Sequence, residues 1–282
     1  MTRLEPVATY LDRILDAHRK AASLDKRDLS SLVAQASLIT QEEPSHKIRP
    51  FDRALTADED LAVIAEIKRR SPSKGDLAID LVPSDMAKAY EAGGAAALSV
   101  LTDQEFFGGS PQDLKAARAI CHLPVLRKDF TVDERDIADA RIMGADAILL
   151  IVAALNDEEL ACFHDRATSL GMSVLVEIHD RNELDRALRC GATLIGVNQR
   201  NLSTFDIDRT LAIRLAPEFP GEIIKVAESG VRGAEDAKHL ADAGYDAVLV
   251  GESLVTSADP TMALDEMRDG STESPNADSG SI

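Results

Sequence analysis

Short apolar runs alternate with amphipathic segments along the chain between residues 62 and 250. Runs that are apolar on both faces and rich in Val, Ile, Leu and Ala are typical of strands in a fully covered parallel sheet. The sequence predicts eight strands, over residues 62–67, 95–101, 124–128, 146–152, 173–178, 193–198, 223–227 and 247–250. Helical spacing predicts helices over residues 83–92, 111–120, 134–143, 157–170, 182–190, 208–215 and 234–243.

The repeated strand–helix unit predicts the fold class. Parallel strands joined by crossover helices, eight times in about 250 residues, are typical of a (β/α)8 TIM barrel. Gly144, Gly191 and Gly244 each follow a predicted helix, where glycine supplies a left-handed cap. The main alternative is a doubly wound open sheet, which more often has GxGxxG after its first strand; that motif does not follow residues 62–67.

The segments outside this repeat differ from it. Val7, Leu11, Ile14 and Leu15 form one stripe and predict a helix over residues 5–23, and a second short helix is possible before residue 49. We therefore expect an N-terminal helical extension over residues 1–50 that packs on a barrel domain of residues 51–267. Residues 268–282 are rich in Ser, Gly and Asp, and we expect them to form a disordered acidic tail.

Composition limits the partners and the compartment. The net charge of −18 argues against nucleic acid or an anionic membrane as a partner. The chain has three widely spaced cysteines and no CxxC motif, which favours a reducing compartment. It shows neither an apolar signal core nor a run approaching the roughly 18 residues needed to span a bilayer. We expect a soluble cytoplasmic protein, present as a monomer or a weak homo-oligomer.

Polar side chains follow the predicted strands at their carboxyl ends, where barrel enzymes place their active sites. These residues are Glu66, Lys68, Lys128, Glu177, Asn198, Arg200, Glu228, Ser229 and Glu252. Taken singly, any of these charges could belong to a structural ion pair. The strand starts, Asp146 among them, show no comparable set, so we expect the polar groups to converge at one mouth only.

The residue types at this mouth indicate acid–base chemistry. Lys128 with Glu177, and Lys68 with Glu66, are interpreted as acid–base pairs. A lysine near other cations in a partly desolvated site is expected to have a lowered pKa, which would make it a proton donor near neutral pH. A Schiff base between a lysine and a carbonyl substrate is the alternative that residue types leave open.

Other residues at the mouth are suited to binding an anion and a ring. The basic turn of residues 69–75, which includes Ser73, could close over a phosphate held at Ser229–Gly230 and Gly251. Phe107 offers an aromatic wall for a substrate or simply packs within its loop. The histidines are scattered without metal-ligand spacing, so we expect no metal site.

These segments resemble those of a known family. They are IAEIKRRSPSKG (64–75), LTDQEFFGGS (101–110), PVLRKDF (124–130), LVEIHD (175–180), IGVNQRNL (195–202), VAESGV (226–231) and LVGESL (249–254). In this order they resemble indole-3-glycerol-phosphate synthase, over about residues 50 to 255. The resemblance implies a carboxy-lyase of tryptophan biosynthesis that closes 1-(2-carboxyphenylamino)-1-deoxyribulose 5-phosphate to indole-3-glycerol phosphate, without a metal or an organic cofactor.

The resemblance also implies roles for single residues. Lys128 matches the general acid and Glu177 its partner base, while Glu66 and Lys68 match residues implicated in condensation and dehydration. The remaining matches concern substrate binding: Asn198 and Arg200 on the hydroxyl and carboxylate side, Phe107 at the ring, and Ser73, Ser229, Gly230 and Gly251 on the phosphate side. For Glu252 only the backbone carries over, because a carboxylate is a poor partner for phosphate.

Two other readings follow from the same residues. Another phosphosugar barrel enzyme, such as phosphoribosylanthranilate isomerase, is expected to pair a Cys and an Asp near strand ends one and four, whereas strand one here ends in Glu66 and Lys68. A barrel that only binds a phosphorylated metabolite has no need of Lys128 and Glu177 together. We therefore expect an enzyme with a small phosphorylated substrate.

Overall fold

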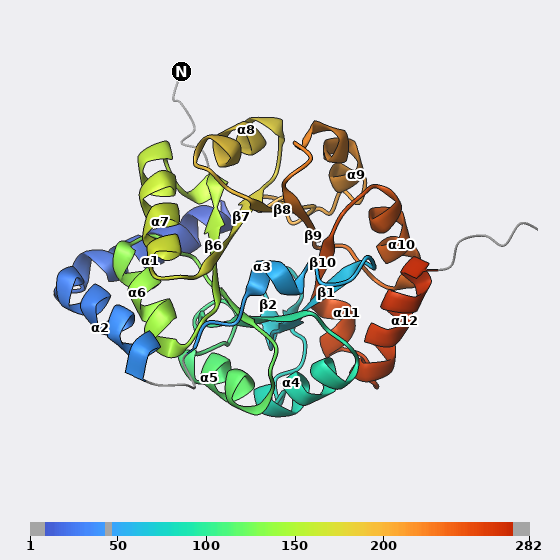
Figure 1. Cartoon of the computed structure of the whole chain (residues 1–282), viewed down its shortest axis with the longest axis horizontal. Helices are drawn as coiled ribbons and strands as arrows, with labels where there is room; N and C mark the ends of the chain where they lie inside the picture. The colour runs from blue at the N-terminus through green and yellow to red at the C-terminus, as the bar shows by residue number, and fades with distance from the viewer. Residues whose placement is uncertain (1–8, 43–46, 273–282) are drawn as a thin grey trace, which may run out of the picture.

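The computed structural model describes residues 9–42 and 47–272, and a closed barrel of parallel strands forms its centre (Figure 1). Around the barrel run β1 (Ala62–Ile67), β4 (Ala97–Leu101), β5 (Val125–Lys128), β6 (Ala147–Ile151), β7 (Ser173–Ile178), β8 (Leu194–Asn198), β9 (Ile224–Glu228) and β10 (Ala247–Val250). Strand β10 pairs with β1 and closes the ring. All eight predicted strands are present, and the predicted (β/α)8 fold is confirmed.

Helices cover the outside of the barrel (Figure 1). They are α4 (Pro83–Ala92), α5 (Pro111–Ile120), α6 (Glu134–Met143), α7 (Asp157–Ser169), α8 (Arg181–Arg189), α9 (Leu211–Leu215), α10 (Ala234–Asp242) and α12 (Pro260–Thr272). Shorter elements are α3 (Phe51–Ala54), α11 (Glu252–Val255), the hairpin strands β2 (Arg70–Ser71) and β3 (Gly75–Asp76), and the 3-10 turns Val152–Ala154 and Ala216–Glu218.

Local sequence explains where these helices begin and end. Helix α6 starts at a capping box between Asp133 and Asp136 and ends at Gly144, whose φ of 100° is the predicted left-handed cap. Helix α9 is shorter than predicted. Its first residues were expected from 208 onward, but Asp208 accepts hydrogen bonds from the N–H and hydroxyl of Thr210, which fixes a turn before Leu211.

Side chains on each strand alternate between the barrel interior and the helix layer. The interior is filled by aliphatic residues such as Ile64, Leu126, Leu175 and Val226, and Phe51 of α3 packs on the same cluster. On each of these strands, the inward position two residues further on is charged: Glu66, Lys128, Glu177 and Glu228 respectively. The alternation that fills the core therefore also aims charged groups into the carboxyl-end mouth.

The N-terminal extension forms two helices, α1 (Tyr10–Leu24) and α2 (Leu29–Glu42), beside α6 and α7 (Figure 1). Helix α1 begins at Tyr10 because Thr9 and Asp12 form a capping box. The first part of the predicted 5–23 helix, including Val7, lies outside the described residues. Ile14 of the predicted apolar stripe is buried.

At the other end of the chain, α12 packs against α4 and α10. It continues to Thr272, so residues 268–272 of the predicted tail are helical. The rest of the predicted tail lies outside the described residues.

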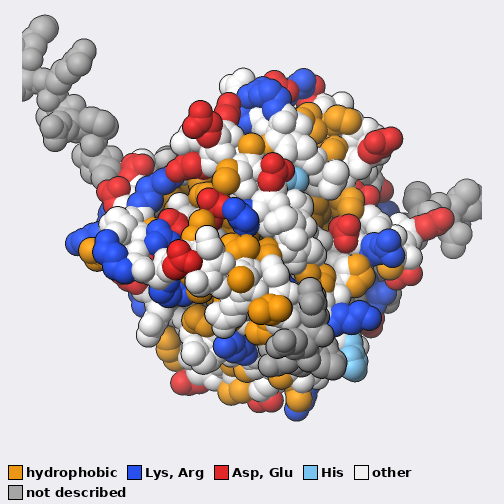
Figure 2. Space-filling model, turned by 60° about the vertical axis from the view of Figure 1, so that its left-hand side comes forward, with side chains coloured by type: hydrophobic (Ala, Val, Ile, Leu, Met, Phe, Trp, Pro, Cys, Tyr) orange, Lys and Arg blue, Asp and Glu red, His pale blue; other side chains and the backbone are white. Residues whose placement is uncertain are grey.

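The surface mixes charges of both signs. On the face shown in Figure 2, Lys and Arg side chains alternate with Asp and Glu, and among the described residues of that face the basic groups do not gather into one large patch. Within residues 9–42 and 47–272, every helix is too short or too polar to cross a bilayer.

Candidate active site

A cavity of about 400 Å3 opens at the carboxyl ends of the barrel strands. Every residue predicted for the site lines it: Glu66, Lys68, Ser73, Phe107, Lys128, Glu177, Asn198, Arg200, Ser229, Gly230, Gly251 and Glu252. The barrel thus brings together segments that lie far apart in the sequence.

Lys128 lies at the centre of the charged set. Its Nζ is 3.4 Å from Glu177 Oε2 and 3.7 Å from Glu228 Oε2. Burial alone would lower the pKa of Lys128, but the charges of Glu177, Glu228 and Glu66 outweigh it and raise this pKa. The expected lowered pKa is therefore wrong, because carboxylates rather than cations surround the ammonium. Lys128 stays protonated near neutral pH and can serve as a hydrogen-bond and proton donor.

The two carboxyl groups beside Lys128 have opposite protonation tendencies. Burial would raise the pKa of Glu177, but Lys128, His179 and a hydrogen bond from Asn198 overcome this and lower it. The pKa of Glu228 is raised well above its usual value, first by burial and then by the charge of Glu177. Two buried carboxyls this close cannot both ionise easily. Lys128 therefore favours the ionised form of Glu177, while burial favours the protonated form of Glu228.

The sequence analysis noted Glu228 at the end of its strand but gave it no catalytic or binding role. The predicted strand ended at residue 227, whereas β9 includes Glu228. The sequence does contain a signal for its direction: Glu228 lies two residues after Val226, which faces the barrel interior, and so belongs to the same face of the strand. Gly196 on neighbouring β8 makes room, because a Cβ there would lie 2.0 Å from Glu228 Oε1.

Glu66 and Lys68 form a second pair at the end of β1. Lys68 Nζ donates to Glu66 Oε1 over 2.5 Å, and both side chains are largely buried. Gly251 lies against them, since a Cβ at this position would lie 2.3 Å from Glu66 Oε1. A glycine is therefore required where the backbone after β10 passes this ion pair.

The basic turn after β1 has a divided role. Ser73 accepts a hydrogen bond from Arg200 Nη1 over 3.2 Å, which joins the loops after β1 and β8 across the mouth. Lys74 Nζ lies 3.5 Å from Glu252 Oε1. Arg69 instead points toward α5, where it pairs with Asp113 and donates to two carbonyls. Arg69 therefore serves structure rather than the predicted anion cradle.

The loop after β9 has a backbone suited to an anion. Ser229 and Gly230 have consecutive positive φ values of 66° and 85°, a geometry that turns backbone N–H groups into a concave nest. Gln199 Nε2 donates to the Ser229 carbonyl over 2.8 Å. Ser253 Oγ, just after Gly251, donates to the Val231 carbonyl and joins the loops after β9 and β10.

Apolar groups form the opposite wall. Phe107 lies 6.3 Å from Phe130 between ring centroids. Tyr10, Leu11 and Ile14 of helix α1 also line the cavity. The sequence predicted the apolar stripe on this helix but not what it covers, because an amphipathic pattern does not identify its partner.

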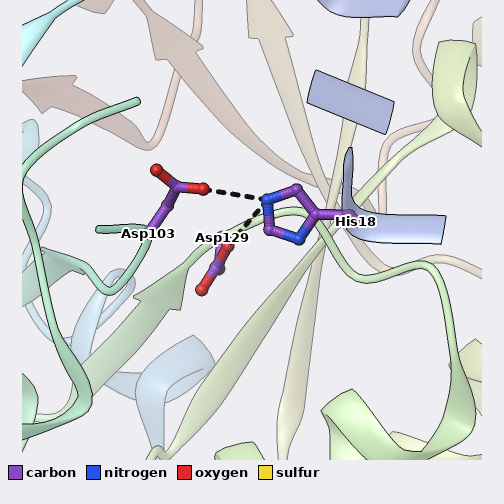
Figure 3. A group of neighbouring side chains, drawn as sticks. All are labelled: His18, Asp103 and Asp129. Carbon is purple, nitrogen blue, oxygen red and sulfur yellow. Dashed lines mark hydrogen bonds and ion pairs between the residues drawn. The ribbon is translucent and has the colours of Figure 1, made fainter. Parts of the chain in front are cut away.

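One group of side chains is close enough to hold a metal ion in the described part of the chain: His18, Asp103 and Asp129 (Figure 3). The carboxylate oxygens of the two aspartates already accept hydrogen bonds. Asp103 accepts from His18 and from the N–H groups of Phe106 and Phe107, and Asp129 accepts from Thr102, Arg127 and the Phe130 N–H. The donor set therefore fits an ion-pair network better than a metal site.

Comparison with known proteins identifies relatives of the chain. A family model described as "Indole-3-glycerol phosphate synthase" matches residues 11–267. The chain is 50% identical over 262 residues to indole-3-glycerol phosphate synthase of Mycolicibacterium gilvum, covering 92% of this chain and 94% of that protein. It is 53% identical over 230 residues to indole-3-glycerol phosphate synthase 2 of Streptomyces coelicolor, covering 82% and 89%.

Solved structures show the fold at lower similarity. Thiamine phosphate pyrophosphorylase from Pyrococcus furiosus superposes with a TM-score of 0.57 at 14% identity, covering 76% of this chain and 96% of that one. This likeness concerns the barrel alone. The sequence matches, which extend over most of the chain, decide the relationship: the chain belongs to the indole-3-glycerol phosphate synthase family.

Proposed function

We propose that this chain closes 1-(2-carboxyphenylamino)-1-deoxyribulose 5-phosphate to indole-3-glycerol phosphate, with release of carbon dioxide and water. One observation carries the proposal: the Lys128 ammonium lies deep in a cavity between Glu177 and Glu228. Family membership supports the substrate and a place in tryptophan biosynthesis. The phosphosugar isomerase alternative is not favoured, because the first and fourth barrel strands end in Ile67 and Ile151 without a paired Cys and Asp.

Lys128 acts in the first step of the proposed reaction. The aromatic carbon that bears the carboxylate attacks the ketone carbon, and the ketone oxygen takes a proton from the Lys128 ammonium. Loss of carbon dioxide then returns the electron pair of the broken bond to the ring. A fixed ammonium beside the oxygen both stabilises its developing charge and supplies the proton.

The second step removes water. The new hydroxyl group takes a proton and leaves as water, and the adjacent carbon, which bears the ring nitrogen, loses a proton to complete the indole double bond. Ionised Glu177 is assigned to accept this proton, because its lowered pKa leaves it free to act as a base. Lys68, held by Glu66, is assigned to supply the proton that departs with water.

The remaining groups are assigned to binding. The phosphate is placed at the nest of Ser229 and Gly230 and at the Gly251 backbone, with Ser73 closing over it. Glu252 contributes its backbone, since its carboxylate is directed to Lys74.

The organic part of the substrate faces the other wall. Asn198 and Arg200 are assigned to its hydroxyl and carboxylate groups, and Phe107 to its ring. The reaction has no net oxidation and is carried by proton transfers, so the proposal needs neither a metal nor an organic cofactor.

The compartment and assembly are proposed from the sequence. Cys121, Cys162 and Cys190 are free thiols, which agrees with a reducing cytoplasm. We expect a monomer or a weak homo-oligomer, measurable by sedimentation.

The direct test mixes the purified protein with the carboxyphenylamino-deoxyribulose phosphate and follows indole fluorescence. We expect turnover with release of one carbon dioxide per indole product. A protein that is folded, binds the substrate and forms no indole product would contradict the proposal.

A further inference from the structure

Helix α1 forms part of the cavity wall, although it lies outside the barrel sequence. Leu11 and Ile14 face the cavity, and His18 follows Ile14 by one helical turn on the same face. The ring of His18 lies 5.6 Å from that of Phe130. His18 therefore lies where the helix passes from the cavity to the barrel rim.

His18 contacts two barrel loops at once (Figure 3). Its Nε2 is 2.9 Å from Asp103 Oδ2, after β4, and 4.0 Å from Asp129 Oδ1, after β5. Asp103 also accepts the N–H of Phe107, and Asp129 directly follows Lys128. Each aspartate is thus tied to a residue that lines the cavity.

The negative charges around His18 favour its protonated, positively charged form. The charged groups that face it are Asp103 from the loop after β4, Asp129 from the loop after β5, and Asp136 from α6. Arg127 donates to Asp129 over 2.9 Å, so a second positive charge is needed to balance Asp103. Burial would lower the pKa of His18, but the hydrogen bond with Asp103 and the charges of the aspartates raise it.

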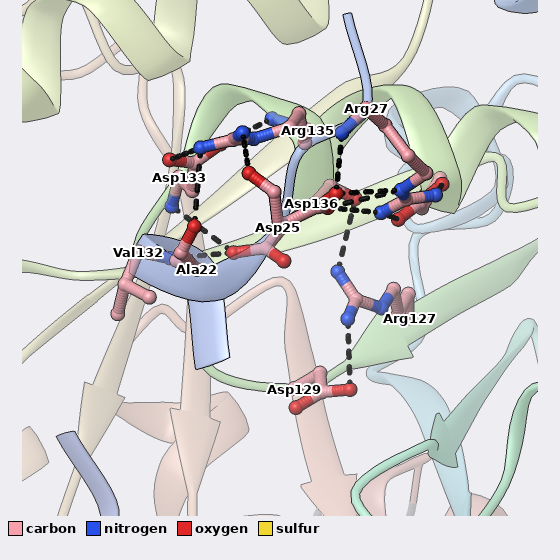
Figure 4. Close-up of polar contacts among 10 residues, drawn as sticks. Ala22, Asp25, Arg27, Arg127, Asp129, Val132, Asp133, Arg135 and Asp136 are labelled. Carbon is pink, nitrogen blue, oxygen red and sulfur yellow. Dashed lines mark hydrogen bonds and ion pairs between the residues drawn. The ribbon is translucent and has the colours of Figure 1, made fainter. Parts of the chain in front are cut away.

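The far end of α1 is held separately (Figure 4). Arg135 of α6 donates to the carbonyls of Ala22 and Asp25 over 3.3 and 2.8 Å. Arg27 pairs with Asp139 over 2.7 Å. Loss of the His18 contact should therefore loosen the cavity half of α1 while the α1–α2 turn stays in place.

We propose that His18 is a positioning residue, whose imidazolium bridges Asp103 and Asp129 and holds helix α1 against the loops that carry Phe107 and Lys128. This inference rests on the proposed function for its kinetic consequence but not for its structural one. The bridge fixes the apolar wall of the cavity. Its loss weakens substrate binding more than it slows the chemical step.

The test compares His18→Ala with His18→Lys, which keeps a positive charge, and with the control Arg19→Gln, which removes an α1 contact to Glu159 on α7. We expect His18→Ala to raise KM about tenfold, with kcat changed less than about threefold. His18→Lys should reverse part of the increase in KM. Arg19→Gln should leave both KM and kcat near those of the parent. The parent's KM should rise at alkaline pH as His18 loses its proton, and this rise should be absent from His18→Lys.

A second measurement separates this inference from the proposed function. Amide hydrogen exchange of residues 10–18 should speed up in His18→Ala while exchange of residues 134–143 is unchanged, whether or not the protein makes the indole product. Unchanged exchange in a folded His18→Ala protein would overturn the inference, and so would an unaltered KM. Activity that is lost on chelation and restored by Zn2+ in the parent but not in His18→Ala would also overturn it, in favour of a metal site.

Discussion

At the amino ends of the barrel strands, Asp146 is fully buried and accepts hydrogen bonds from the backbone N–H groups of Arg49 and Val125 and from the guanidinium of Arg118. At the carboxyl ends, Glu177 and Glu228 are almost equally buried and line the cavity, but the buried Oε1 of Glu228 has no hydrogen-bond partner among the described residues. Both ends contain buried carboxyl groups, and they differ in how many of the carboxyl oxygens accept a hydrogen bond.

This difference separates structure from function better than charge alone does. The Asp146 network ties Arg49, which follows the N-terminal helices, to the barrel, and Arg118 also donates to the Lys47 carbonyl. The strand starts were expected to show no set comparable to that at the mouth. Asp146 does begin a predicted strand, but the cation that pairs with it, Arg118, comes from α5, and its other two donors are the backbone N–H groups of Arg49 and Val125. At the mouth, by contrast, a carboxyl group that lines the cavity keeps one oxygen without a hydrogen-bond partner among the described residues.

The largest expected effect is on the mouth. Lys128→Met removes the proposed acid and should lower turnover by about a thousandfold, while binding of indole-3-glycerol phosphate and the urea midpoint change little. Fluorescence assays measure turnover and product binding, and urea unfolding measures the midpoint. Lys115→Met, on the exposed face of α5, is the matched control and should behave as the parent. Turnover within about tenfold of the parent would remove Lys128 from the acid role.

The opposite end should respond in the opposite way. Asp146→Ala removes the carboxylate that accepts from the Arg118 guanidinium and from two backbone N–H groups, and we expect a loss of about 3 kcal/mol in unfolding free energy. The kcat of the folded fraction should stay near that of the parent. Asp139→Ala breaks a partly exposed pair with Arg27 and should cost less than about 1 kcal/mol. Equal losses for the two variants would contradict the structural role of Asp146.

The sequence predicted the mouth because two simple patterns determine it. Strand alternation places Glu66 on the face of Ile64 and Glu177 on the face of Leu175, and parallel strands bring such ends to one side. Local signals such as Gly144 set the helix ends. These features depend on neighbours in the sequence or on the repeat, so they can be inferred without coordinates.

The features that were missed depend on contacts between distant segments. The direction of the Lys128 pKa shift follows from Glu177 and Glu228, which lie 49 and 100 positions further along the chain. The placement of α1 against the cavity, and the bridge from His18 to Asp103, cannot be read from an amphipathic pattern. Glu228 was noted at its strand end but given no role, because its contact with Lys128 joins strands far apart in the sequence.

A smaller effect is expected at the phosphate nest. Gly230→Val places a side chain at a φ of 85°, with its Cβ 2.9 Å from Ile207, and should displace the backbone N–H groups. We expect about tenfold weaker binding of indole-3-glycerol phosphate and little change for its dephosphorylated form, measured by calorimetry. Gly191→Val has the same φ of 85° in open space and should leave both affinities unchanged. Equal weakening for both ligands would place the phosphate elsewhere.

The smallest effect should appear as a dependence of stability on pH. The pKa of Glu228 is higher in the folded protein than in the unfolded chain, where it is near the usual 4.5, so the folded state binds this proton more tightly. The resulting stability is fully present below the unfolded pKa and is lost as the pH rises through the raised one. Glu228→Gln carries no ionisable group at this position and should flatten this decline in urea unfolding free energies measured between acidic and alkaline pH.

Asp146 also has a raised pKa, from burial above all, so Glu228→Gln in the Asp146→Asn background isolates the contribution of the mouth. A decline that persists unchanged in both Glu228→Gln proteins would show that Glu228 does not hold the proton.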